Sequence, residues 1–325
     1  MKNPVEYPKR LLLTMLLTSL LSFSSFADPV QWGDIDANGT LDISDVTMLI
    51  SYVLNDAGVD NMSVADMNGD GCLDVTDVTM LIAQVLNPEP QLETVTVTVN
   101  GVSFKMVFVL GNTFMMGSSA FTDPDAYRNE SPVHEVTIWS YYIAETEVTQ
   151  ELWMAVMGKN PSAFQGDLKR PVENVSRFEC ARFVDKLTEL TGKVFRMPTE
   201  AEWEYAARGA GYSRGFRFAG YEEVDAVAWY VENAMGGTQP VGMKEPNEIG
   251  LYDMSGNVFE WCQDFYSSYD AEPQVNPIGP ESGFDNVIRG GAWNSVAAQC
   301  RVSFRGNMSP YEASDNVGLR LAMNY

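Results

Sequence analysis

Cysteine, histidine and basic residues are scarce in this chain of 325 residues. Four cysteines are too few to hold a fold of this length together by disulfides. The single histidine, His134, has no Cys or Asp at metal-ligand spacing, which favours a packed or capping role. Lys and Arg total 21 against 44 acidic residues, and the net charge of -23 argues against nucleic acid or an anionic membrane as a partner.

A membrane-spanning run is also missing. The apolar stretch 11–21 is too short to cross a bilayer. Basic residues precede it, and Ser25-Phe26-Ala27 fits a small-x-small cleavage site. We therefore predict a signal peptide over residues 1–27 and a secreted chain. No Cys follows the cleavage point, which argues against a lipid anchor.

The acidic region that follows contains a repeat. Two similar segments begin 32 residues apart, at Asp34 and Asp66, in a region (28–90) without Lys or Arg. Each copy has oxygen ligands at positions 1, 3, 5 and 12 of a loop, glycine at position 6 and a carbonyl at position 7, the pattern of a calcium loop. Apolar residues at i, i+3, i+4 and i+7 predict one amphipathic helix after each loop. The predicted ligands are Asp34, Asp36, Asn38, the carbonyl of Thr40 and Asp45, then Asp66, Asn68, Asp70, the carbonyl of Cys72 and Asp77.

With one helix after each loop and Asp at position 12, the segment 32–87 resembles a type I dockerin. The resemblance implies a small all-α, duplicated EF-hand-like domain over residues 28–87 that holds two Ca²⁺ ions. It also implies a partner, the cohesin domain of a scaffoldin or cell-surface protein. The implied contact positions are Ile43, Ser44, Ile50 and Ser51, with Val75, Thr76, Ile82 and Ala83 in the second copy.

Prolines place a stiff linker at 88–94, and a large domain is predicted over 95–325. Its first strands form a hairpin around Asn100-Gly101, and a second apolar run spans 136–143. Helices are predicted from Thr149 to Gly158, around 178–190 with Phe183, Leu187 and Leu190 on one face, and from Thr199 to Gly209. Glu202 completes a capping box with Thr199, and with Glu200 and Glu204 it is predicted to form a solvated face.

Two glycine-rich stretches follow. In GLYDMSGNVFEW (250–261), Asp253 and Glu260 flank a glycine turn, which is either structural or, with the carbonyls of Gly256 and Val258, a Ca²⁺ cage. In the stretch 289–320, two glycines beside a Trp, alternating Val302 and Phe304, and three arginines predict a strand, a long surface loop and a closing strand.

Seven motifs occur in order: FVLGNTFMMGS, YIAETEVTQELW, RPVENVS, FRMPTEAEWEYAARG, GLYDMSGNVFEW, RGGAW and NVGLRLA. With them, residues 95–325 resemble the formylglycine-generating enzyme family, also called sulfatase-modifying factors. The resemblance implies a C-type-lectin-like fold, mixed α+β with much irregular structure. It also implies a calcium ion at Asp253, Gly256, Val258 and Glu260.

Catalytic members of that family resemble copper oxidases that use two thiolates after the GG-x-aromatic strand. Counted from Trp293, these positions hold Ser295 and Cys300 here. A serine hydroxyl is a poor ligand for soft Cu(I), so Cys300 alone makes a poor copper site unless Cys262 reaches it. Cys262 with Cys300 is also the preferred disulfide pair. We therefore predict a non-catalytic binding module, with a formylglycine-generating oxidase that acts on a sulfatase cysteine through Cys300 as the alternative.

In the binding interpretation, a ligand-binding face on a rigid scaffold is formed by the loop 294–299 and the surface 305–315. The ligand is either a protein or a glycan. Packing in the core is the favoured alternative for Trp293 and for Phe304. The predicted ligand contacts are Trp293, Asn294, Arg305 and Tyr311.

Overall fold

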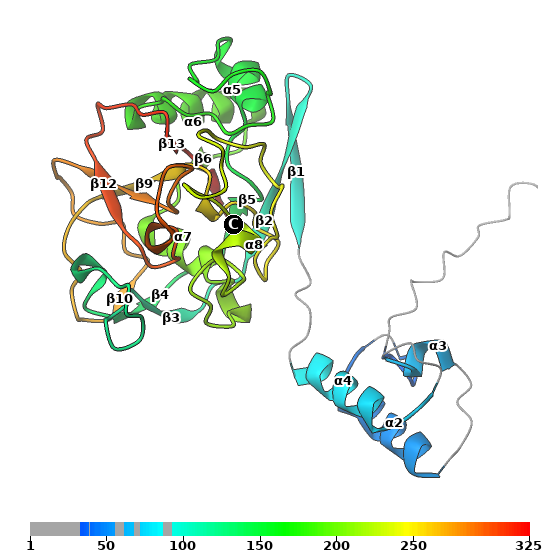
Figure 1. Ribbon diagram of the computed structural model, residues 1–325. Helices are drawn as coiled ribbons and strands as arrows, with labels where there is room; N and C mark the ends of the chain where they lie inside the picture. Colours follow the sequence, from blue (N-terminus) through cyan, green and yellow to red (C-terminus); the bar gives the residue numbers. More distant parts are fainter. Residues whose placement is uncertain (1–32, 39, 56–61, 68–71, 87–92) are drawn as a thin grey trace, which may run out of the picture. The chain divides into compact units, whose positions relative to one another are not determined.

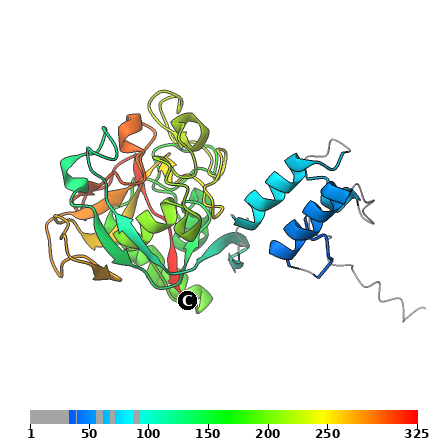
Figure 2. The same ribbon diagram turned by 90° about the horizontal axis from the view of Figure 1, so that it is seen from below.

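The computed structural model describes residues 33–38, 40–55, 62–67, 72–86 and 93–325. The predicted signal peptide, most of the predicted linker, and the predicted ligands Asn68 and Asp70 lie outside the described residues. The chain divides into two compact units, 1–89 and 90–325 (Figures 1 and 2), and each is described by itself. Among the described residues, no helix combines the length and the apolarity needed to span a membrane.

The first unit is helical, with α2 (Ile43–Asn55) and α4 (Val75–Leu86) packed against each other and a short α3 (Met62–Ala65). Each long helix follows one acidic loop, as the repeat predicted. The apolar stripes of both helices meet, which confirms the amphipathic pattern. The buried side chains of this small core are Val46, Leu49, Ala65, Met67, Val78 and Leu81.

The second unit is organised around an antiparallel five-stranded sheet of order β1-β2-β5-β14-β6. The predicted hairpin is confirmed: β1 and β2 pair across Asn100 and Gly101, whose φ values of 47° and 85° suit the left-handed turn that this dipeptide favours. The last strand of the chain, β14, is inserted between β5 and β6. The strands are β1 (Thr94–Val99), β2 (Val102–Val109), β5 (Tyr141–Ala144), β14 (Ala322–Asn324) and β6 (Phe195–Arg196).

Two helices, α5 (Gln150–Met157) and α6 (Arg177–Thr191), pack against each other and against this sheet. The predicted ends of α5 are confirmed, since the Thr149 hydroxyl accepts from an N–H of the first turn and Gly158 is left-handed. On α6, Phe183 and Leu187 are buried as predicted, but Leu190 is 47% exposed. Leu190 lies in the last turn, beyond the reach of the core.

Three smaller sheets complete the unit. The apolar run 136–143 is divided between β4 and β5. The stretch 301–305 is a turn and not the predicted strand, with the Phe304 N–H donating to the Arg301 carbonyl at 3.1 Å. The remaining strands are β3 (Thr113–Met116), β4 (His134–Thr137) and β10 (Gln274–Val275); β9 (Phe259–Phe265), β11 (Asn286–Arg289), β12 (Gly306–Met308) and β13 (Val317–Gly318); and β7 (Ala228–Trp229) with β8 (Ser255–Gly256).

The helix α7 (Glu200–Ala207) lies wholly within the protein and contacts β3, β9 and β11. Its capping box between Thr199 and Glu202 is confirmed. The other helical segments are short, and long loops connect them, so the unit is mixed α+β with much irregular structure as predicted. The short helical segments are α8 (Val224–Val227) and the 3-10 turns Arg128–Glu130, Ala210–Tyr212 and Ala297–Gln299.

Candidate functional site

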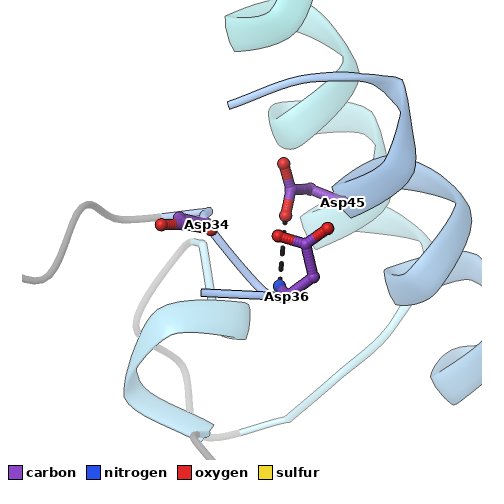
Figure 3. A group of neighbouring side chains, drawn as sticks. All are labelled: Asp34, Asp36 and Asp45. Atoms are coloured by element: carbon purple, nitrogen blue, oxygen red, sulfur yellow. Dashed lines mark hydrogen bonds between the residues drawn. The ribbon is translucent and has the colours of Figure 1, made fainter. Parts of the chain in front are cut away.

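The first acidic loop brings three predicted ligands together (Figure 3). Carboxylate oxygens of Asp34, Asp36 and Asp45 all lie within 4.8 Å of one another, the one such group of potential metal ligands among the described residues. Asp45 is buried at the start of α2, where its Oδ1 accepts from the N–H of Ile35 at 2.8 Å. Converging carboxylates are the hard donors that Ca²⁺ prefers, so this loop fits a calcium ion.

The second loop repeats the same closing contacts 32 residues later. Asp77 is buried and accepts from the N–H of Met67 at 2.8 Å, as Asp45 does from Ile35. Oδ2 of Asp77 accepts from the backbone N–H of Asp74 at 2.9 Å. Oδ2 of Asp45 accepts in the same way from the backbone N–H of Asp42, also at 2.9 Å. Asp66 is also buried, and Cys72 presents an exposed side chain. The described residues of the two loops thus make the same closing contacts.

Within the first loop, Asn38 and Thr40 turn toward the same centre. The Asn38 side chain accepts from the Thr40 N–H at 2.8 Å and donates to Asp36 at 2.8 Å. Sequence reasoning missed Asp42 at loop position 9, where calcium loops commonly supply a ligand through water. Asp42 caps α2 by accepting from the Ser44 N–H at 2.7 Å, and hydrogen bonds from Ser44 lower its pKa.

Four fully enclosed arginines form the main polar feature of the large unit. Each is paired with a buried carboxylate, and none of the eight side chains is more than 6% exposed. Such pairs cost desolvation but are severely destabilising when only one partner is removed. The pairs are Arg289 with Glu204, Arg301 with Glu130, Arg305 with Glu200, and Arg320 with Glu260.

These pairs overturn the prediction that the glutamates of α7 form a solvated face. Glu200, Glu202 and Glu204 are 5%, 8% and 0% exposed. They point in different directions, as helical geometry requires, and each meets a different arginine. Glu202 pairs with Arg196 at 2.6 Å, while Glu204 also receives Arg208 at 2.7 Å.

Glu260, a predicted ligand of the calcium cage, is held in a buried ion pair with Arg320. Both of its oxygens accept from Arg320, at 2.7 and 3.0 Å, and one also accepts from the Trp203 indole at 2.6 Å. Glu260 is therefore the anionic partner of a buried ion pair. Beside it, the Gly256 N–H donates to the Gly290 carbonyl and the Val258 N–H donates to the buried Glu147.

Asp253 lies beside this pair. It is 2% exposed and in the left-handed region with φ of 58°, and its Oδ2 accepts from the Gly242 N–H at 2.7 Å. Burial raises the pKa of Asp253 to about 6. Burial, and then the charges of Asp253 and Glu260, raise the pKa of Glu147. Three buried carboxylates thus share Arg320.

The predicted ligand contacts are divided by the fold. Trp293 is half-buried, with its indole N–H donating to the Asp315 carbonyl at 3.0 Å. Asn294 is exposed, and Tyr311 is 79% exposed with its ring 4.9 Å from that of Phe178. Arg305 is 3% exposed, so the prediction that it contacts a ligand is wrong. Its guanidinium is bound by Glu200 and lies over the Tyr269 ring at 3.7 Å.

The two positions of the expected thiolates are also enclosed. Ser295 is 3% exposed, and its hydroxyl accepts from the Ala292 N–H at 3.0 Å. Cys300 is fully buried, and burial raises its pKa to about 12. A Cβ added to Gly291 would lie 2.8 Å from the Cys300 sulfur, so only glycine permits this approach. The residues packed around Cys300 are Phe218, Val227, Ala228 and Tyr230.

The predicted disulfide between Cys262 and Cys300 is wrong, since both thiols are free. Cys262 belongs to a different part of the core, with Trp203 and Val287 among its neighbours. His134 is packed as predicted: it is 3% exposed, and its ring lies 4.7 Å from that of Tyr269.

Comparison with protein families assigns both units. The model of the sulfatase-modifying factor enzyme 1-like domain (FGE-sulfatase) matches residues 93–325. The chain belongs to this family. The model of the dockerin type I domain matches residues 32–86, so the FGE-sulfatase domain follows a dockerin domain. Both resemblances are confirmed, and dockerin domains generally bind calcium.

Relatives of the FGE-sulfatase domain carry different names. The chain is 32% identical over 270 residues to the chaperone protein LppX of Paenibacillus barcinonensis, covering 68% of this chain and 89% of that protein. It is 30% identical over 280 residues to the formylglycine-generating enzyme of Streptomyces coelicolor, covering 65% and 87%. Among solved structures, Treponema denticola variable protein 1 is similar with a TM-score of 0.65 and 34% identity over 73% of this chain and all of that chain. The large unit therefore has the C-type-lectin-like fold of this family.

Proposed function

We propose that this chain is a secreted binding protein. Its dockerin domain attaches it to a cohesin-bearing partner, and its FGE-sulfatase domain presents a ligand-binding surface. One observation carries the proposal. At the two positions where catalytic members of the family are expected to hold thiolates, this chain has a buried, protonated thiol, Cys300, and a serine, Ser295.

A copper ion does not fit these residues. Cu(I) is held by thiolates, and one thiol with a pKa near 12 is protonated at neutral pH. The Cys300 sulfur donates a weak hydrogen bond to the Val296 carbonyl at 3.8 Å, and its other neighbours are apolar. The hydroxyl of Ser295 already closes a turn by accepting from Ala292. Among the described residues packed around Cys300, none therefore offers a second soft ligand.

We define the ligand face as the exposed surface around Trp293, Asn294, Val296, Val231 and Tyr311. The Val231 N–H donates to the Ser295 carbonyl at 3.0 Å, which places Val231 beside the loop. Val231 and Val296 are 53% and 52% exposed. Exposed apolar side chains that cluster on a rigid scaffold are typical of interaction surfaces.

The rigidity of this face comes from the groups beneath it. The Trp293 ring packs edge-on against Phe164 at 5.2 Å. Asn294 accepts from the side chain of Asn316 at 3.0 Å, which joins the loop to the segment that carries Tyr311. A binding role also agrees with the name chaperone protein given to the Paenibacillus relative.

On the dockerin domain, matching positions of the two copies expose apolar side chains. Ile43 and Val75 are each 69% exposed, and Ile50 and Ile82 are each 37% exposed. These are four of the positions that the dockerin resemblance assigned to cohesin contact. Their equal exposure supports a docking surface that is present in both copies.

Two measurements test the proposal. The reduced chain is titrated with Cu(I) against a competing chelator, with Cys300→Ser as the control, and we expect no tight site in either. A one-to-one tight site that Cys300→Ser removes would instead support the oxidase named for the Streptomyces relative. Pull-down with a cohesin panel should succeed with the native chain and fail when Ile43, Ile50, Val75 and Ile82 are all replaced by Asp.

The ligand face is tested separately by Tyr311→Ala. Partners captured by the immobilised chain from a glycan array or a surface extract should be lost in this variant. Capture that is unchanged by Tyr311→Ala and by Asn294→Ala together would exclude the face. Turnover of a Cys-containing sulfatase peptide would exclude a purely binding role.

A further inference from the structure

A cavity lies at one end of the five-stranded sheet. It has a volume of about 410 Å³ and is lined by Trp139, Arg196, Gln263, Asn276, Asn324 and Tyr325 among others. The strand pairings explain the convergence: Tyr141 is opposite Asn324, and Ala322 is opposite Arg196. The start of β5 and the end of β14 therefore meet here, and the side chain of Arg196 on β6 reaches them by donating to Asn324. We call this cavity the sheet-end cleft; none of the residues of the ligand face lines it.

Two aromatic rings stand at the rim of the sheet-end cleft. Trp139 is 71% exposed, yet its backbone is fixed, because its N–H donates to the Asn276 side chain at 2.7 Å. The Asn276 N–H in turn donates to the Thr137 carbonyl at 2.8 Å. Tyr325 is 79% exposed and leans on Phe108, with ring centroids 5.0 Å apart. An anchored ring left in solvent presents a flat apolar surface at little entropic cost on binding.

The floor of the cleft is polar, and its charged side chains are paired. Arg196 donates to both oxygens of Glu202, at 2.6 and 2.7 Å, and its Nε donates to Asn324 Oδ1 at 2.7 Å. Glu202 also accepts from the Thr199 N–H at 2.9 Å. The one cation and the one anion among the lining side chains therefore neutralise each other.

Amide groups remain to receive a ligand. Asn276 and Asn324 each use the side-chain oxygen in a hydrogen bond within the protein, at 2.7 Å in both cases. In the part of the chain that the structure describes, their amide nitrogens and the whole side-chain amide of Gln263 have no protein partner. These groups offer donors and an acceptor at fixed positions between the two rings.

This combination selects a ligand class. An anion would find no free cation in the cleft, and a cation would find both oxygens of Glu202 already bound. A ligand with apolar ring faces and many hydroxyl groups matches the rings and the amides together. The volume lies in the range of about 300–1,000 Å³ that is usual for small-molecule sites and not for protein interfaces. We propose that the sheet-end cleft binds a neutral oligosaccharide, with a sugar ring on Trp139 and hydroxyl groups on Asn276, Asn324 and Gln263.

The proposal is independent of the ligand face and is tested by calorimetry on the full chain without its predicted signal peptide. The probes are three neutral hexasaccharides, cellohexaose, xylohexaose and mannohexaose. At least one should bind, and Trp139→Ala should weaken it by about tenfold or more. Trp139→Phe keeps a ring and should retain part of the affinity. Phe284→Ala, which removes a 97% exposed ring outside the cleft, is the matched control and should leave the Kd unchanged.

Tyr311→Ala should also leave the Kd unchanged, which separates this site from the ligand face. Three outcomes would overturn the proposal. The first is that no hexasaccharide binds at concentrations up to about 10 mM. A Kd above that limit corresponds to a binding free energy of less than about 3 kcal/mol. The second is a Kd that Trp139→Ala does not alter. The third is that Trp139→Ala abolishes capture of a protein partner while no sugar binds, which would make the cleft part of a protein interface.

Discussion

Arg305 donates from Nε and Nη2 to the two oxygens of Glu200, at 2.6 and 2.7 Å, across 105 positions of sequence. The remaining guanidinium donors reach the carbonyls of Asn129 and Ser267, both at 3.0 Å. One side chain therefore joins the helix α7 to two loops and to the segment before β12. This makes Arg305 part of the scaffold beneath the surface and not part of a ligand contact.

Removal of Arg305 should therefore destabilise the large domain. In Arg305→Met, Glu200 keeps its burial and loses its cation, so we expect the free energy of unfolding to fall by about 3–5 kcal/mol. Urea unfolding followed by tryptophan fluorescence measures this, since every Trp except Trp32 lies in the large domain. The control is Arg182→Met, whose side chain is 68% exposed and 3.9 Å from Glu179; it should change stability by less than about 0.5 kcal/mol. Equal effects of both variants would contradict this account.

The stability of the large domain should also depend on the charge of Asp264. Burial, and then the charge of Glu200, raise the pKa of Asp264 to about 8. Between its ordinary value and pH 8, the folded chain holds a proton that the unfolded chain releases, so this group makes stability fall as pH rises through that window. Asp264→Asn removes the charge but keeps a side-chain oxygen that can accept from the Glu200 N–H. In the native chain this hydrogen bond joins the Glu200 nitrogen to Asp264 Oδ2 at 2.9 Å. The variant should exceed the native chain in stability at pH 8 and lose that advantage near pH 4.5.

The exposed Asp185 provides the control for this measurement. Asp185→Asn should follow the native chain at every pH, because Asp185 is in solvent on α6. The pKa of Asp253, raised to about 6, also makes stability fall as pH rises, but it does so equally in the native chain and in Asp264→Asn. The difference in stability between these two proteins therefore reports on Asp264 alone. A difference that does not vary with pH would show that Asp264 has the same pKa in the folded and in the unfolded chain.

Thiol reactivity gives a third prediction. Cys72 is exposed, whereas Cys180, Cys262 and Cys300 are buried with pKa values raised by burial. Iodoacetamide at pH 8 attacks thiolates, so it should label Cys72 alone in the folded chain and all four in guanidinium chloride. Peptide mass spectrometry reads the sites. Rapid labelling of Cys300 in the folded chain would remove the main argument against an oxidase.

Local sequence signals predicted local structure well. Asn100-Gly101 specified a hairpin, Thr149 and Gly158 specified both ends of a helix, and the 12-residue spacing brought Asp34, Asp36 and Asp45 together. In each of these cases the residues that decide the geometry are close in the chain.

The contacts that sequence reasoning missed are long-range. Glu204 and Arg289 are 85 positions apart, and the sequence around each residue does not indicate with which residue it pairs. An alternating row of glutamates is ordinarily solvated, so the burial of α7 follows only from the arginines that surround it. The same reason separates Cys262 from Cys300: both lie in glycine-rich stretches, but the fold packs them into different clusters.

Calcium should bind to the dockerin domain and not at Glu260. Without a cation, the carboxylates of Asp34, Asp36 and Asp45 repel one another within 4.8 Å, and an ion relieves that repulsion. We therefore expect two ions for each full chain by elemental analysis and one in Asp36→Asn. Asp185 is exposed, so Asp185→Asn is the control and should retain two ions.

Amide exchange gives a second measurement. Chelation should accelerate exchange in α2 and α4 and leave 250–261 protected, because Arg320 already neutralises Glu260 at 2.7 Å. A third ion, or loss of protection at 250–261 on chelation, would restore the calcium cage around Asp253 and Glu260.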